Sequence, residues 1–134
     1  VLLGWKSNRV KVDADFRYRG VSFPDKDAVN LGFALPKYSG GLRATYDISS
    51  RLYAGVAVEA SSWREGKCVS AVSEELAKVR VPGYVDLGVN CGYKFNRKLE
   101  FWLESGNLLC QAIQKNPFYA EKGPWVTAGV SLNL

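Results

Sequence analysis

Glu100 and Glu104 form a candidate carboxylate pair for acid–base chemistry in this chain of 134 residues, which contains no histidine. Residues i and i+4 of an extended strand lie roughly 13 Å apart at a rise of about 3.3 Å per residue. That separation is too wide for a shared proton, and no glycosidase-like pair is supported. Without histidine, the Ser/His/Asp and Cys/His nucleophile systems are also excluded. We therefore expect no catalytic residues and no enzymatic activity.

The three cysteines are the other reactive side chains. Cys68, Cys91 and Cys110 are odd in number and lack CxxC spacing, and the absence of histidine removes the common mixed zinc sites. The sequence thus predicts no metal site and no cofactor. A Cys68–Cys110 disulfide and two unpaired thiols both remain open.

The net charge and the composition limit which classes of partner the chain is expected to bind. The net charge is +5, and the cations alternate with acids along the chain instead of forming a block, so nucleic acid is not an expected partner. No apolar run is long enough for a membrane helix. The chain begins at Val1 and has no methionine, so we treat it as a mature chain or a fragment.

Strict alternation of apolar and polar residues positions these side chains. Residues 9–19 place Val10, Val12 and Ala14 on one face and charged residues on the other. This period of two is the signature of a β-strand. The same pattern recurs in residues 37–47, 51–61, 84–95, 99–103 and 125–134, and residues 1–5 read as the end of a further strand. No apolar-face position in these seven segments carries a charge.

The connections between the segments alternate in length. Those near residues 6–9, 47–50 and 95–98 are short, whereas residues 20–36, 62–83 and 105–123 are long. An antiparallel up-and-down meander with tight turns at one rim and long loops at the other is typical of a transmembrane β-barrel. We expect an all-β fold with about seven strands. In the second long connection, Val69, Val72, Leu76 and Val79 have near-helical spacing, and residues 73–75 predict a turn of helix.

The barrel assigns a role to each face. The charged face is predicted to line a lumen, and its candidate residues are Arg17, Arg43, Glu59, Asp86, Glu100, Trp102 and Glu104. The apolar face is predicted to contact lipid through Val12, Phe16, Leu42, Val56, Leu87, Val89, Phe101, Val130 and Leu132. Aromatic residues of that face near the strand ends, Trp5, Tyr18, Tyr38, Tyr46, Tyr93 and Phe95, are expected to form interfacial girdles.

The strand count bears on domain organisation. Bacterial single-chain barrels have an even number of strands with both ends at the short-turn rim. Seven strands ending at Leu134 would put Val1 at the opposite rim. We therefore expect residues 1–134 to be a single domain that is the C-terminal portion of a larger outer-membrane barrel.

Residues 82–134 resemble the C-terminal strands of TonB-dependent-receptor-like outer-membrane barrels. The stretches that carry the resemblance are residues 82–88, Tyr93–Asn96, Gly106–Leu109 and the last strand, where Thr127, Gly129, Leu132 and Leu134 are similar to the recognition signal of outer-membrane proteins. That signal usually ends in an aromatic residue, so Leu134 departs from it. The resemblance implies nutrient uptake at the cell outer membrane, assembly through the barrel-assembly machinery and coupling to a periplasmic energy-coupling protein.

One rival architecture fits the same alternation. In a soluble lipocalin-like barrel, apolar residues would point inward around a small apolar ligand and charges would face water. The asymmetric connections and the charge-free apolar face favour the membrane barrel.

Overall fold

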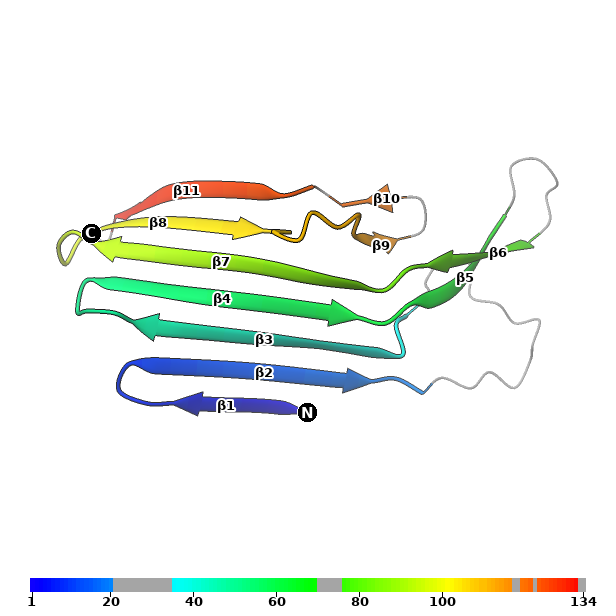
Figure 1. Cartoon of the computed structure of the whole chain (residues 1–134), viewed down its shortest axis with the longest axis horizontal. Coiled ribbons are helices and arrows are strands. Elements are labelled where there is room, and N and C mark those ends of the chain that lie inside the picture. Colours follow the sequence, from blue (N-terminus) through cyan, green and yellow to red (C-terminus); the bar gives the residue numbers. More distant parts are fainter. Residues whose placement is uncertain (21–34, 70–75, 117–118, 122, 133–134) are drawn as a thin grey trace.

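The computed structural model describes residues 1–20, 35–69, 76–116, 119–121 and 123–132. Its main element is a seven-stranded antiparallel sheet (Figure 1). Across the sheet, the strands are β1 (Leu2–Lys6), β2 (Val10–Tyr18), β3 (Tyr38–Asp47), β4 (Leu52–Ser61), β7 (Tyr84–Lys94), β8 (Leu99–Gly106) and β11 (Trp125–Leu132). The seven predicted segments all form strands, and the all-β antiparallel meander is confirmed.

The register of the sheet keeps the two kinds of residue on separate faces. Between β4 and β7, for example, Val56 pairs with Val89 and Glu59 pairs with Asp86. Because successive side chains of a strand point to opposite faces, this register extends the apolar positions of one strand onto the next. Alternation in the sequence thus becomes one apolar and one polar face of a single sheet.

Short side-chain hydrogen bonds close the tight turns at one end of the sheet. In the β3–β4 turn, the Ser49 hydroxyl accepts hydrogen bonds from the backbone N–H groups of Arg51 and Leu52, at 3.2 and 3.1 Å. In the β7–β8 turn, Oδ1 of Asn96 accepts from the N–H groups of Lys98 and Leu99, both at 2.8 Å. Ser and Asn favour turns because their side chains replace missing backbone partners in this way.

The long connections carry two additional hairpins at the other end of the sheet (Figure 1). β5 (Arg64–Val69) pairs with β6 (Leu76–Val81), and β9 (Gln114–Asn116) pairs with β10 (Tyr119–Ala120). The prediction of a helical turn around Val69 and Leu76 is therefore wrong, because both residues pair across a strand ladder. Val72 and residues 73–75 lie outside the described residues.

The sheet is a single open layer. Only Val81, Tyr84 and Ile113 are buried apolar residues in the described part, and all three lie at the end with the long connections. The edge strands β1 and β11 do not pair with each other, so the described sheet is not closed. Among the described residues, no helix is long and apolar enough to cross a membrane.

Candidate functional site

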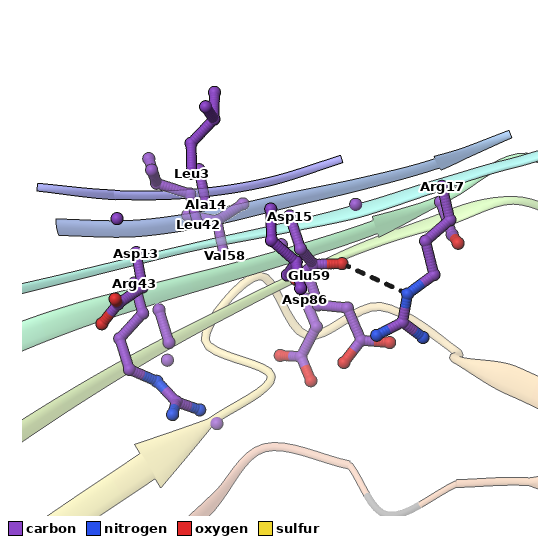
Figure 2. Close-up of a pocket in the computed structure, with 18 of the residues that line it drawn as sticks. Leu3, Asp13, Ala14, Asp15, Arg17, Leu42, Arg43, Val58, Glu59 and Asp86 are labelled. Atoms are coloured by element: carbon purple, nitrogen blue, oxygen red, sulfur yellow. Dashed lines mark ion pairs between the residues drawn. The ribbon is translucent and has the colours of Figure 1, made fainter.

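A hollow of about 710 Å³ crosses the polar face of the sheet. Residues from β1, β2, β3, β4, β7, β8 and β11 line it, so it belongs to the whole sheet and not to one loop. Figure 2 shows Arg17, Arg43, Glu59 and Asp86 projecting from one side of the strands, whereas Leu3 projects from the other. The hollow thus has charged side chains with glycines between them, and the strands that carry them also border it through Leu2, Leu3, Ala14, Leu42 and Val58.

Strand register explains how carboxylates gather in the hollow. Asp15 of β2 pairs with Gly41 of β3, Gly41 pairs with Glu59 of β4, and Glu59 pairs with Asp86 of β7. The three carboxylates thus follow one row across the sheet. On the next row toward the short turns, Asp13 of β2 lies directly opposite Arg43 of β3.

Each carboxylate of this row has a different partner. Nε of Arg17 lies 3.6 Å from Oδ2 of Asp15 (Figure 2). The Tyr84 hydroxyl donates a hydrogen bond of 2.5 Å to Oε1 of Glu59, and the backbone N–H of Asn107 donates one of 2.8 Å to Oδ1 of Asp86. The negative charges are therefore held by a guanidinium, a phenol and a backbone amide, which fixes their orientation along the hollow.

Five of the seven predicted lumen candidates line this hollow. They are Arg17, Arg43, Glu59, Asp86 and Glu104. Glu100 and Trp102 share a face of β8 with Glu104 but lie nearer the short turns, and neither lines the hollow. Glu100 accepts a hydrogen bond of 2.9 Å from the Tyr53 hydroxyl, so its carboxylate serves a cross-strand contact.

Aromatic rings on the polar face fill the space above glycines of neighbouring strands. Tyr53 pairs in register with Gly92, and Trp102 pairs with Gly129. A Cβ atom at either glycine would overlap the partner ring. Trp125 stands in the same relation to Gly106, where a Cβ would come within 2.7 Å of the indole. The rings of adjacent strands thus occupy the space above these three glycines.

The predicted lipid-facing residues lie on the other face of the strands. Val130 of β11 is 59% exposed, and most of the set is similarly open. Phe16, Leu42, Val56, Val89, Phe101, Val130 and Leu132 are exposed, while Val12 and Leu87 are of intermediate burial. An exposed apolar face of this extent is unusual for a protein surrounded by water.

A compact polar cluster, which no sequence pattern predicted, lies where β7 and β8 meet the long connections. The Arg64 side chain is 5% exposed, and its Nη2 donates a hydrogen bond of 2.5 Å to the carbonyl oxygen of Gln114. Asn107 is 1% exposed, and its amide exchanges hydrogen bonds with the backbone of Gln111. The cluster joins the β5–β6 hairpin and the β8–β11 connection to the start of β7.

The described residues contain no group of histidine, cysteine and carboxylate side chains that could hold a metal ion. Cys91 and Cys110 carry exposed free thiols. A Cys68–Cys110 disulfide, which the sequence left open, is therefore not present in this structure.

Comparison with known proteins shows the fold. The chain is similar to the siderophore receptor PirA from Acinetobacter baumannii, with a TM-score of 0.80 and 18% sequence identity over 98% of this chain. The match spans 21% of the PirA chain, so this sequence corresponds to about a fifth of that receptor's length. No family model and no curated protein matches the sequence. The sheet is therefore built like one section of the wall of a β-barrel receptor.

Proposed function

We propose that this chain is part of the wall of an outer-membrane transporter or receptor, with its apolar face against lipid and its charged hollow toward the lumen. The proposal rests on one observation: the same sheet has an exposed apolar face on one side and a charged face on the other. Val89 and Asn90 are neighbours on β7, yet the Val89 side chain belongs to the exposed apolar face and Asn90 to the polar face. A bilayer is the environment that stabilises such an outer face, because exposed apolar surface costs free energy in water.

The same geometry argues against the soluble rival. A lipocalin-like barrel would direct apolar residues into its hollow. Here the hollow is lined by Asp13, Asp15, Arg43, Glu59 and Asp86, while apolar residues such as Phe101 are exposed on the other face. A charged hollow suits a polar cargo better than a small apolar ligand.

If the chain belongs to a membrane barrel, we favour a receptor of the TonB-dependent type, located in the outer membrane and active in nutrient uptake. The likeness of fold to a siderophore receptor supports this class. In this proposal the chain is the C-terminal portion of the barrel, contributes no catalysis, assembles through its last strand and depends on a periplasmic energy-coupling protein. The cargo would meet the charged hollow as it passes through the lumen.

Extraction of the full-length protein from cells tests the membrane assignment. We expect it to sediment with outer membranes, to resist extraction by high salt or alkali and to become soluble only in detergent. Recovery of folded protein in aqueous buffer without detergent would reject the wall and favour the soluble barrel. Growth on a chelated nutrient, with and without the energy-coupling protein, then tests the receptor class separately.

A further inference from the structure

A second hollow, of about 300 Å³, lies on the polar face of the sheet at the tight turns. Three cations line it: Arg9, which precedes β2, Arg51, which precedes β4, and Lys94, the last residue of β7. Among the described residues around it, Asp47 at the end of β3 is the single carboxylate. This excess of positive charge raises the local concentration of anions.

Backbone hydrogen bonds hold these charges beside one another. The N–H of Asp47 donates a hydrogen bond of 2.8 Å to the carbonyl oxygen of Arg9, and the N–H of Lys94 donates one of 2.7 Å to that of Arg51. The β4–β7 register thus continues into the turn and sets Arg51 directly opposite Lys94. Like charges in that arrangement repel, and an anion between them reduces the repulsion.

The three cations have no carboxylate partner within the described part of the chain. The ion pairs found there belong to other residues and join Lys11 to Asp13, Arg17 to Asp15 and Lys115 to Glu121. Lys94 faces Glu100 in the β7–β8 register, but that carboxylate accepts the hydrogen bond of the Tyr53 hydroxyl. The donor groups of the three cations are therefore open to a ligand.

Polar turn residues complete the hollow. Asn8, Ser49 and Ser50 line it with the cations. The Ser49 hydroxyl oxygen accepts from the N–H groups of Arg51 and Leu52, so its own proton can be donated to another acceptor. Guanidinium, ammonium and hydroxyl donors together suit the oxygens of carboxylate or phosphate groups.

In the proposed wall, this hollow faces the lumen and not the lipid. Asp47 and Lys94 belong to the polar face, whereas their neighbours Tyr46 and Tyr93 are exposed on the apolar face. Successive side chains of a strand point to opposite sides of the sheet. A molecule that occupies the hollow therefore reaches it through the lumen, as a solute would.

The size of the hollow and the charges beyond it favour a short anion over an extended acidic chain. Its volume lies at the lower end of the range for small-molecule sites. Further from the tight turns, the larger hollow has more carboxylates than cations, namely Asp13, Asp15, Glu59, Asp86 and Glu104 against Arg17 and Arg43. A long acidic segment that followed the wall would be repelled there, whereas a small anion stays beside the three cations.

We propose that the hollow of Arg9, Arg51 and Lys94 is a lumen-side binding site for a small multivalent oxyanion, a solute that carries two or more carboxylate or phosphate groups. Two such groups on one solute can meet the Arg51–Lys94 pair and Arg9 at the same time, which a single carboxylate cannot do. This inference rests on the proposed wall, because the polar face lines a lumen only in that wall. It adds a charge class of solute, at the tight-turn end, to the polar cargo proposed above.

The test uses the full-length protein folded in neutral detergent, with citrate as the multivalent probe and acetate as the monovalent one. Isothermal titration calorimetry at low salt compares the unaltered protein with the double variant Arg51→Gln/Lys94→Gln. The matched control is Arg19→Gln/Lys37→Gln, which removes two exposed cations that also face each other but lie outside the hollow, beside the long β2–β3 connection. We expect citrate to bind more tightly than acetate, and the hollow variant to lose about tenfold or more of the citrate affinity. The control variant keeps that affinity, and added salt weakens it.

Amine acetylation locates the site without any substitution, so it also serves if the double variant fails to fold. Bound citrate should protect Lys94 from a water-soluble acetylating reagent, as read by mass spectrometry of the digested protein. Lys37, which is exposed at the other end of the sheet, should react equally with and without citrate.

Three results would overturn the proposal. The first is equal affinity for citrate and acetate, or an equal loss in the hollow and control variants. The second is equal protection of Lys94 and Lys37, which would mean that citrate only screens charge. The third is tighter binding of polyglutamate than of citrate, abolished by the hollow variant, which would assign the hollow to an acidic polypeptide. Failure of the wall itself is recognised separately, because the folded protein would then be recovered in buffer without detergent.

Discussion

The Trp102 indole of β8 occupies the space above Gly129 of β11, its partner in the strand register. A side chain of any size at residue 129 would have to share that space. The same relation joins Tyr53 to Gly92 and Trp125 to Gly106, so three ring–glycine pairs bridge adjacent strands on the polar face. These ring–glycine contacts replace part of the packing that a second layer of structure would supply.

Gly129→Ala should destabilise the last hairpin by about 1 to 3 kcal/mol, because its Cβ overlaps the Trp102 ring. Denaturant unfolding in detergent measures the change. Gly123→Ala is the control, since nothing lies within 4 Å of a Cβ there. If the ring causes the loss, Gly129→Ala costs little in a Trp102→Ala background. Equal costs in both backgrounds would contradict the contact.

Val89→Arg should impair membrane assembly, whereas Asn90→Arg should not. The two residues are adjacent on β7, but Val89 belongs to the exposed apolar face and Asn90 to the polar face. An arginine at the bilayer midplane costs about 2 to 4 kcal/mol. Folding into vesicles, followed by the heat-dependent gel shift of the barrel, measures the difference. Similar behaviour of the two variants would argue against a lipid-facing apolar side.

Tyr84→Phe should weaken the contact between the start of β7 and Glu59 of β4. The Tyr84 hydroxyl donates a hydrogen bond of 2.5 Å to Glu59, and the ring is buried. Loss of a hydrogen bond to a charged group costs about 1.5 to 3 kcal/mol. Tyr46→Phe serves as the control, because Tyr46 is exposed. Hydrogen exchange of residues 84–88 reports the effect, and unchanged protection would show that the bond is not holding this segment.

Thiol labelling should separate the two exposed cysteines. Cys91 belongs to the apolar face of β7, while Cys110 follows β8 at the end with the long connections. In a Cys68→Ser background, a charged maleimide added to intact proteoliposomes should label Cys110 and spare Cys91 until the protein is denatured. A Cys110→Ser variant identifies the labelled site. Rapid labelling of Cys91 in the bilayer would place that face in water.

Much of the main sheet follows from the sequence because strand side chains alternate with a period of two. Residues such as Val85, Leu87 and Val89 specify both the strand and the face that it presents, and the short turns then set the register. The same logic placed Arg43, Glu59 and Asp86 on one face. It did not show that Glu59 and Asp86 would lie side by side, because β4 and β7 are joined by the long connection that carries the β5–β6 hairpin, and no short turn sets their register.

The structure at the end with the long connections could not be predicted from the periodicity of apolar residues. The apolar residues Val69, Leu76 and Val79 have near-helical spacing, yet they belong to β5 and β6, because pairing between two strands outweighs local spacing. Nothing near Arg64 marks it for burial, since its Nη2 donates to the carbonyl oxygen of Gln114, which lies 50 residues further along the chain. Contacts of that kind are set by tertiary structure and leave no local pattern.

The single open layer has a consequence for which substitutions this sheet should tolerate. Little of its stability depends on interlocking side chains, since the backbone ladder carries the architecture and few residues are buried. We therefore expect substitutions that keep the alternation of apolar and polar residues to be tolerated at most positions. A likeness of fold at a TM-score of 0.80 with 18% identity is compatible with that expectation. The slowly changing positions should be the ring–glycine pairs, where one residue constrains another.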